Sequence, residues 1–470
     1  MKTLIAGGLL MLVTLLPFSS FHLKGRMYSY DTQENYLYNF RNADASLSRI
    51  PLRKGNLTLP MDLKDDQTIF LKLRIDTRIL GKCCQPSVTI KTTASENTQY
   101  FEHNASGIRY INLSSCIKEA DRKISLEGTH VSIPDQMAEL IICTTREMSK
   151  ARVMIISPHP DDAEIAAYGL YSKLDDPYII TITAGDSGEP KYEDVYEETS
   201  EQFLKKGELR TWNSISIPLL AGVPHENVIN MGYYDQTLKK MFDCDPKEVY
   251  SVKSDVSDIN TFRKQNISTL ATKLHGKANW SSLVNNLEIL VNEIKPDIIV
   301  TPHPEIDTHV DHIYSTLALF EALKNINYRH GDIFFYTNHH TCSEYYPYGE
   351  QGGVVSMPPN FNPDFYMKSI YSFPLNEEMQ SDKLFALEAM HDLRPDMEWN
   401  SIKGALKIAA ENAKRDILGL DQSYYKRAIR SNELFFIVPV SDIYSERKLE
   451  LICGVNHIID SPLVFYDLHN

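Results

Sequence analysis

ISPHPDDAEIAAYG, residues 156–169, joins a short apolar run to an alanine-rich segment through one histidine and two adjacent aspartates. The apolar residues 153–156 predict a buried strand, and the prolines that follow end it. Asp161 or Asp162 then lies where a helix beginning near Ala163 needs an acceptor for its first amide groups. Capping accounts for one aspartate, whereas two adjacent carboxylates in a partly buried setting favour a bound cation or a shared proton.

A second apolar run, residues 296–301, predicts another strand and leads directly into PHPEIDTHVDH at 302–312. This segment is rich in groups that bind metals or protons, namely His303, Asp307, His309, Asp311 and His312. His309 and His312 are three residues apart at a predicted helix start, so they can project from the same side. Open parallel sheets bind ligands at the carboxyl ends of their strands. One histidine and one aspartate from the first stretch, with one histidine from the second, therefore predict a zinc centre that keeps a position for water.

The chain changes character near residue 150. Over residues 27–148, short runs rich in β-branched and aromatic residues alternate with turn residues, which predicts a β-rich, sandwich-like domain. Over residues 149–470, apolar runs are followed by longer helical patterns. That alternation predicts an α/β domain with a Rossmann-like, mostly parallel sheet and flanking helices.

Residues 1–26 form a separate segment, in which Lys2 precedes an apolar run from Leu4 to about Phe18. This pattern predicts either a signal peptide or an uncleaved membrane anchor. We therefore expect the protein to be periplasmic or secreted, or to be attached to a membrane by this segment. The formal net charge of -14 opposes a broad electrostatic attraction to nucleic acid, so no nucleic-acid partner is expected.

Features outside the two motifs carry weaker expectations. The seven cysteines fit no zinc pattern, and a disulfide of an exported chain would most readily join Cys83 or Cys84 to Cys116. The two histidines at 339–340 follow an apolar run and are expected to be exposed at the end of a strand. The glycine- and proline-rich segment 345–362 would suit either a loop over the site or a long surface connection.

The two motifs resemble the signatures of a known family. PHPDDAE at 158–164 and HVDH at 309–312 are similar to the paired motifs of the PIG-L/LmbE-like family of zinc-dependent N-acetylglucosaminyl deacetylases. The similarity covers about residues 151–440 and takes in TAGDSG at 183–188 and YDQTL at 234–238, which resemble a glycine-rich segment and an Asp-containing loop of the family. The resemblance implies the family's α/β fold, with zinc as the cofactor.

The resemblance also assigns the metal chemistry to individual residues. It implies that the zinc ligands are His159, Asp162 and His312. Asp161 becomes the general base that takes a proton from the water that the metal activates. This division is chemically sound, because zinc lowers the pKa of its water to about 7 and a neighbouring carboxylate can then accept the proton near neutral pH.

Further roles follow from the same resemblance. His309 would stabilise the tetrahedral intermediate or donate a proton to the leaving amine. Asp311 would orient a histidine and adjust its charge. Arg210 and Asp235 match the family's substrate contacts. Arg210 with Trp212 could hold a sugar by hydrogen bonding and ring stacking, or could be a helix-surface arginine beside a core tryptophan.

Together, the motifs and the resemblance predict a hydrolase that removes N-acetyl groups from an N-acetylglucosamine-type amino sugar or its glycoconjugate, which would be its partner molecule. Two alternatives stay open. A metal-dependent phosphoesterase would also use clustered histidines and aspartates. A catalytically inactive carbohydrate-binding protein is the second, although a purely structural zinc site would not need Asp161.

Overall fold

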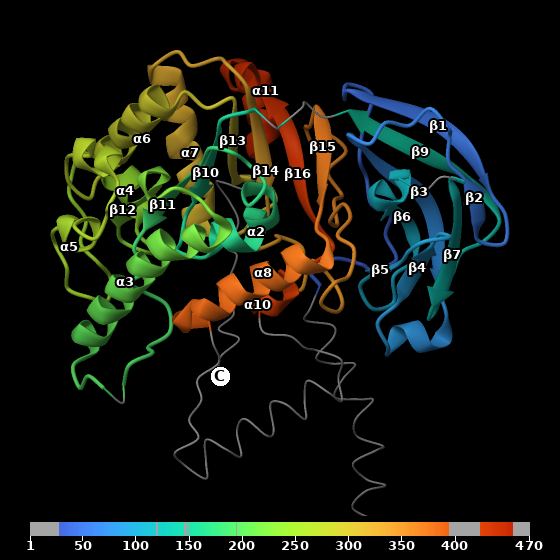
Figure 1. The fold of residues 1–470 in the computed structure, drawn as a ribbon, viewed down its shortest axis with the longest axis horizontal. Coiled ribbons are helices and arrows are strands. Elements are labelled where there is room, and N and C mark those ends of the chain that lie inside the picture. The colour runs from blue at the N-terminus through green and yellow to red at the C-terminus, as the bar shows by residue number, and fades with distance from the viewer. Residues whose placement is uncertain are drawn as a thin grey trace, which may run out of the picture.

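The computed structural model describes residues 28–454 apart from 119–120, 145–147, 149, 194 and 394–423 (Figure 1). The predicted signal peptide or anchor at 1–26 lies outside the described residues. Among the helices that are described, none is both long enough and apolar enough to cross a bilayer. The elements fall into a β-rich N-terminal half and a C-terminal half that combines a mixed sheet with helices.

Two antiparallel sheets build the N-terminal half. The first contains β1 (Ala45–Leu52), β9 (Gln136–Thr144), β3 (Gln67–Thr77) and β6 (Gly107–Asn112) in that order, with β8 (Val131–Ser132) paired to β3. The second contains β2 (Asn56–Thr58), β7 (Lys123–Thr129), β4 (Ser87–Lys91) and β5 (Glu96–Tyr100). All pairs between these strands are antiparallel, which confirms the prediction of a β-rich N-terminal region.

The side chains of β3 alternate between two cores, because successive residues of a strand point to opposite faces. Ile69, Leu71 and Leu73 pack into a core to which both antiparallel sheets contribute. Phe70 points to the other face and joins the hydrophobic core that continues into the C-terminal half. The strand β3 is therefore covered on both faces.

A seven-stranded sheet organises the C-terminal half, in the order β12, β11, β10, β13, β14, β16, β15. Its strands are β10 (Val153–Ser157), β11 (Pro177–Thr183), β12 (Val228–Tyr233), β13 (Ile298–Pro302), β14 (Asp332–Tyr336), β15 (Ser369–Pro374) and β16 (Asn432–Pro439). The strands from β12 to β14 pair in parallel, whereas β16 runs antiparallel to both neighbours. The chain moves outward from β10 to β12 and then returns to β13 on the other side of β10. That switch point is where open sheets of this type bind ligands.

Helices cover both faces of this sheet (Figure 1). They are α2 (Asp162–Tyr171), α3 (Thr199–Ser216), α4 (Leu238–Cys244), α5 (Asn260–Arg263), α6 (Trp280–Ile294), α7 (Val310–Asn325), α8 (Glu377–Ala389), α10 (Tyr424–Arg427) and α11 (Glu446–Cys453). In β10, Val153 and Ile155 pack in a core with residues of α2 and α8, whereas Met154 and Ile156 pack in a core with α6 and α7. A strand covered on both faces reads as an uninterrupted apolar run, as β10 does.

The two halves meet through the segment 345–362 and the edge strand β15. Asn112 of β6 donates hydrogen bonds from Nδ2 to the carbonyl of Val355 (2.8 Å) and to Oγ of Ser372 (2.9 Å), and all three residues are buried. Buried polar groups are paired in this way because an unpaired one would be costly. The segment 345–362 is therefore part of the contact between the halves and not a surface connection.

The expected disulfide does not form. All seven cysteines lie among the described residues, and no disulfide joins any two of them. Cys116 is buried in the core between the two antiparallel sheets, whereas Cys83 and Cys84 are exposed, so the predicted pairing is wrong. A disulfide requires two sulfur atoms in contact, which a core position and a surface position do not provide.

Candidate active site

The carboxyl ends of the neighbouring parallel strands β10 and β13 bring the two motifs together. After β10, the turn is held by Ser157, whose Oγ donates to the carbonyl of His159 (2.6 Å) and accepts from the amide of Ala163 (3.1 Å) at the start of α2. After β13, the chain turns and His309 precedes α7 as its N-cap residue. The side chains of both turns thus face one crevice at the switch point of the sheet.

Three atoms of the predicted metal ligands form a small triangle. Nδ1 of His159 lies 3.2 Å from Oδ2 of Asp162 and 3.2 Å from Nε2 of His312, and those two atoms are 3.1 Å apart. All three side chains are buried. A tetrahedral zinc site with bonds of about 2.0–2.1 Å holds its ligand atoms about 3.3–3.4 Å apart. The residues therefore fit a metal ion both by the type of donor and by their spacing.

The charges around the triangle also favour a cation. Burial opposes the charged form of His312, but the carboxylates of Asp162 and Asp307 outweigh it and raise the pKa of the ring to about 10. Burial alone would raise the pKa of Asp162, whereas His312 and His159 hold it well below its usual value. The cluster thus retains positive charge, and a divalent cation can supply that charge in place of protons.

A second layer of contacts fixes the ligands. Asn338 donates from Nδ2 to Oδ1 of Asp162 (2.8 Å), the oxygen that does not face the histidines. Oδ1 of Asp307 lies 3.1 Å from Nδ1 of His312, and its Oδ2 accepts from the amide of Asn338 (2.9 Å). Contacts of this kind orient metal ligands and raise their basicity. Sequence reasoning missed Asn338, although its place just after β14, next to β13 in the sheet, was the available signal.

Two carboxylates face the other nitrogen of His159. Its Nε2 lies 3.2 Å from Oδ1 of Asp235 and 3.5 Å from Oδ2 of Asp311, although neither pair has the alignment of a hydrogen bond. Asp311 also accepts from the amides of Gln236 (2.6 Å) and Leu238 (3.2 Å), which fixes its place. Asp311 therefore lies where a residue that orients a histidine has to lie. Asp235, which we expected to contact substrate, lies against the same ring.

Asp161 borders the triangle and pairs with Arg210. Nη2 of Arg210 is 3.3 Å from Oδ1 of Asp161, and Nη1 is 2.7 Å from Oδ2 of Asp392. Burial raises the pKa of Asp161, and the guanidinium partly offsets this rise. Gly185 packs on the guanidinium, with φ at +68° and a position for Cβ only 2.5 Å from Nε of Arg210. Trp212 is 46% exposed and does not face Arg210, because residues two apart on a helix point in different directions.

His309 lies against both histidines of the triangle. The centroid of its ring is 4.6 Å from that of His159 and 4.8 Å from that of His312. Burial and these neighbouring imidazoles hold its pKa well below the usual value, so the ring is neutral. The potential ligand atoms of these three histidines lie within 4.8 Å of one another, as do those of His159, Asp235 and Asp311.

The histidines at 339–340 differ from what the sequence predicts. His340 is only 2% exposed, and its Nδ1 accepts from the amide of Cys342 (3.1 Å). His339 is half-buried, with its ring centroid 5.5 Å from that of His309. The expectation of exposed histidines is therefore wrong. An antiparallel bridge between Asp307 and His340 draws the two segments together, and this long-range pairing leaves no trace in the local sequence pattern.

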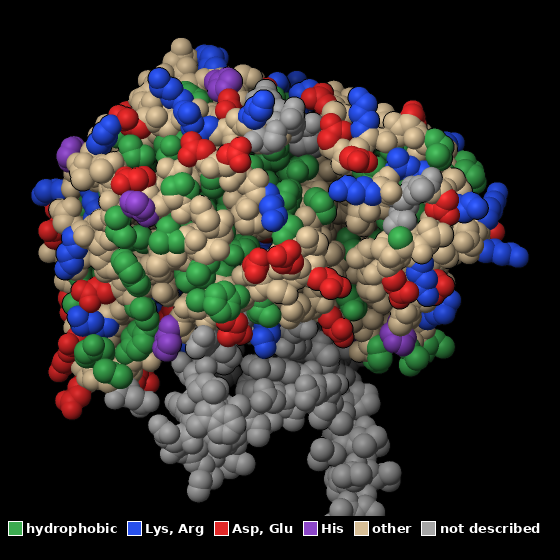
Figure 2. Space-filling model, viewed as in Figure 1, with side chains coloured by type: hydrophobic (Ala, Val, Ile, Leu, Met, Phe, Trp, Pro, Cys, Tyr) green, Lys and Arg blue, Asp and Glu red, His purple; other side chains and the backbone are tan. Residues whose placement is uncertain are grey.

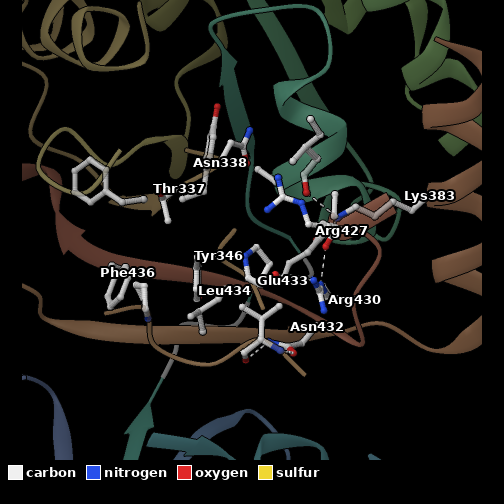
Figure 3. A pocket seen from close by; sticks show the side chains of 18 residues that line it. Thr337, Asn338, Tyr346, Lys383, Arg427, Arg430, Asn432, Glu433, Leu434 and Phe436 are labelled. Atoms are coloured by element: carbon white, nitrogen blue, oxygen red, sulfur yellow. Dashed lines mark hydrogen bonds and ion pairs between the residues drawn. The ribbon is translucent and has the colours of Figure 1, made fainter. Parts of the chain in front are cut away.

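A cavity of about 70 Å³ adjoins the metal centre (Figure 3). Asn338 lies on its wall, so the residue that holds Asp162 also borders this space. Another part of the wall carries the buried ion pair between Lys383 and Glu433, whose Nζ and Oε1 are 2.9 Å apart. Residues of the segment 345–362 complete the lining, so this segment reaches the site as well as the N-terminal half.

The model of the PIG-L family, described as GlcNAc-PI de-N-acetylase, matches residues 154–323. No curated protein matches the chain. Among solved structures, the zinc-inhibited form of the teicoplanin deacetylase Orf2 is 14% identical over 61% of this chain and 98% of that chain, with a TM-score of 0.32. The 4-carboxy-2-hydroxymuconate hydratase GalB from Pseudomonas putida KT2440 is 14% identical over 61% of this chain and 96% of that chain, with a TM-score of 0.29.

Neither structural likeness is close enough to carry a conclusion about activity, so the family match carries it. The matched segment contains all of the predicted site residues, from His159 to His312. The match supports an enzyme with deacetylase activity and confirms the family resemblance read from the paired motifs. Residues 154–323 of this chain, which contain the predicted site residues, match the model of the PIG-L family.

Proposed function

We propose that the protein is a zinc-dependent hydrolase that removes the N-acetyl group from an N-acetylglucosamine-type amino sugar or its glycoconjugate. The observation that carries this proposal is the place of Asp161, a buried carboxylate next to Asp162 that interacts electrostatically with His159 and pairs with Arg210. A site that only bound a metal would not need this second carboxylate, whereas a hydrolytic site needs a base. The family match supports the class of substrate.

His159, Asp162 and His312 would hold the metal. When bound, zinc would lower the pKa of a water molecule and polarise the carbonyl of the acetamido group. Asp161 accepts the proton that the attacking water loses. Arg210, 3.3 Å away, orients this carboxylate and counteracts the rise in its pKa that burial causes.

His309 is the group that we assign to the later stage of the reaction. Its low pKa keeps the ring neutral, with one nitrogen carrying a proton. That N–H can donate a hydrogen bond to the oxyanion that develops on the acetyl carbonyl. The ring can also pass a proton to the leaving amine, so that acetate and a free amine are the products.

Asp311, Asp235 and Arg210 complete the proposed machinery. Asp311 and Asp235 face Nε2 of His159 and would orient this ring, so that its Nδ1 points to the metal. Arg210 and Asp235 match the family's substrate contacts by sequence. We therefore propose that both residues position catalytic groups at the border of the substrate site.

The proposal is tested by metal removal and replacement. Protein stripped with a chelator should release no acetate from soluble N-acetylglucosamine glycosides, and addition of one equivalent of zinc should restore the release together with an equal amount of free amine. Release of phosphate from phosphate monoesters without acetate release would overturn the proposal in favour of a phosphoesterase. Glycoside binding without any turnover by the zinc-loaded protein would overturn it in favour of an inactive carbohydrate-binding protein.

A further inference from the structure

An apolar turn protrudes from one end of the N-terminal half. It is the short helix η1 (Ile79–Lys82), which directly follows β3. Ile79 is 87% exposed and Leu80 is 59% exposed, and the neighbouring Arg78 and Lys82 are exposed as well. Two adjacent large apolar side chains are thus exposed between two cations.

The turn is held rigidly in this position. The amide of Arg78 donates to the carbonyl of His130 (3.0 Å), and the carbonyl of Gly81 accepts from the amide of Asn104 (2.8 Å). Gly81 itself is buried, and a Cβ there would lie within 2.4 Å of the carbonyl oxygen of His130. These backbone contacts fix the conformation of the turn, and in this conformation the side chain of Ile79 is exposed.

The turn lies beside the place where the described chain begins. The hydroxyl of Tyr28 accepts from the amide of His103 (3.1 Å), and the next residue, Asn104, bonds to Gly81 in the turn. Before Tyr28, the sequence carries the apolar run of residues 4–18. Residues 19–27 separate this run from Tyr28, and an extended segment of that length reaches at most about 30 Å. An apolar run that is held in a membrane would therefore keep the turn close to the membrane surface.

We propose that this turn docks the protein on a phospholipid bilayer, with Ile79 and Leu80 inserted at the interface and Arg78 and Lys82 at the level of the phosphates. Short apolar insertions flanked by cations bind bilayers through buried apolar area and attraction to anionic lipids. The net charge of -14 opposes a general attraction of the molecule to such a surface, so the contact depends on this local turn and on the N-terminal run.

The place of the turn in the molecule agrees with a membrane-facing side. In Figure 1, η1 is the short blue helix at the lower right, and α8 lies along the lower edge of the C-terminal half. Figure 2 shows hydrophobic side chains gathered at that end. The metal centre lies at the start of α2, at the carboxyl ends of the parallel strands. Docking through the turn would therefore direct this edge of the sheet toward the bilayer.

Fluorescence quenching by lipid tests the proposal on the full chain. Ile79→Trp places a reporter in the turn, which follows the C-terminal end of β3. Met61→Trp is the matched control, because Met61 is 70% exposed and precedes the N-terminal end of the same strand. β3 spans 11 residues, so about 35 Å separate its two ends. Each variant is bound to vesicles of phosphatidylcholine and phosphatidylglycerol, with and without brominated phosphatidylcholine, and compared with the unaltered protein.

Brominated lipid should reduce the fluorescence that Ile79→Trp adds by about twofold or more, and should leave that of Met61→Trp unchanged. Adding Leu80→Gln to Ile79→Trp should weaken the quenching, since it removes half of the inserted apolar surface. Quenching of Ile79→Trp that is no greater than that of Met61→Trp would overturn the proposal. If Leu80→Gln leaves the quenching unchanged, Leu80 is not inserted, and the proposal that both side chains insert is overturned.

Discussion

Two adjacent aspartates take different roles because their side chains meet different partners. Asp162 places one oxygen at the triangle of ligands and gives the other to Asn338. Asp161 turns instead to Arg210, at the border of the triangle. The neighbouring histidines hold the pKa of Asp162 well below its usual value, whereas burial raises that of Asp161. One carboxylate is thus suited to bind a cation and the other to accept a proton.

The contact from Asn338 should contribute to metal affinity. Asn338→Ala removes the hydrogen bond to Oδ1 of Asp162, so the carboxylate is no longer fixed for the metal. We expect zinc affinity to fall by about 10–100-fold, measured by competition with a chromophoric chelator. Asn325→Ala is the control, because that amide bonds Glu288 at the exposed end of α7 (2.8 Å). Equal zinc affinity in the two variants would contradict the assigned role.

His303 should make the stability of the protein sensitive to acid. Burial lowers its pKa from the ordinary 6.5 to about 3. At pH values between about 3 and 6.5, His303 binds a proton in the unfolded chain but not in the folded chain. The contribution of His303 to the free energy of unfolding is therefore present above pH 6.5 and is lost as the pH falls toward 3. From about pH 7.5 to about pH 5.5, the unfolding free energy of the unaltered protein should fall by about 1.4 kcal/mol relative to His303→Gln. Urea denaturation at both pH values measures the difference, and a constant difference would refute the prediction.

At the scale of elements, the second half of α2 is held by β16 and α8. Within α2, Ala167 has non-helical dihedral angles (φ -144°, ψ 15°). The carboxylate of Glu433, on β16, accepts from the amides of Gly169 and Leu170 (2.8 Å each) just after this kink, and pairs with Lys383 of α8 (2.9 Å). The antiparallel strand therefore helps to fix the helix that begins at the two aspartates of the candidate site.

The buried ion pair of Lys383 and Glu433 gives a test of this arrangement. Lys383→Met should lower the free energy of unfolding by about 3–5 kcal/mol, because it leaves the charge of Glu433 buried without its partner. Adding Glu433→Gln to that variant should recover part of the loss, since the unpaired charge is then removed. Urea denaturation of the single and double variants measures both effects. A double variant that is less stable than Lys383→Met would show that the charge of Glu433 is not the source of the cost.

The loop after β11 offers a second test at this scale. Gly185→Ala would place a methyl group 2.5 Å from Nε of Arg210, so the guanidinium has to leave Asp161. We expect acetate release to fall while zinc content is unchanged, because Arg210 does not contact the triangle. Gly222→Ala controls for backbone strain, since Gly222 also has a positive φ (+81°) but has open space at its Cβ position. Equal activity of both variants would contradict the role of Arg210.

At the scale of the whole molecule, the two halves share one continuous core. Side chains from β3, β6 and β9 lie in the same hydrophobic cluster as side chains from α6, α7 and the seven-stranded sheet. The buried amide of Asn112 links β6 to Val355 and to Ser372 of β15. We therefore expect one cooperative unfolding transition in scanning calorimetry, with a lower midpoint for Asn112→Ala. Two separate transitions for the described halves would contradict this expectation.

The features that could be predicted from the sequence are those that depend on residues close together in the chain. The meeting of the two motifs could be predicted because each directly follows an apolar strand, and strand ends meet at one edge of a parallel sheet. The choice of His159, Asp162 and His312 as the ligands rested on the family resemblance. Asp392 could not be predicted, because it reaches Arg210 through the packing of distant segments, whereas the only signal for Asn338 was its place just after the strand β14. The direction of β16 is hidden for the same reason, since its apolar pattern is the same in a parallel and an antiparallel strand. Burial of Cys116 likewise depends on how two sheets pack.

The central claim is that Asp161 activates water beside a metal held by other residues. Asp161→Asn keeps the size of the side chain and removes the base. With zinc content measured on the same samples, acetate release from N-acetylglucosamine glycosides should fall by about 10²–10⁴-fold while each molecule still binds one equivalent of zinc. Acetate release at the unaltered rate, or loss of zinc in parallel with activity, would contradict the account.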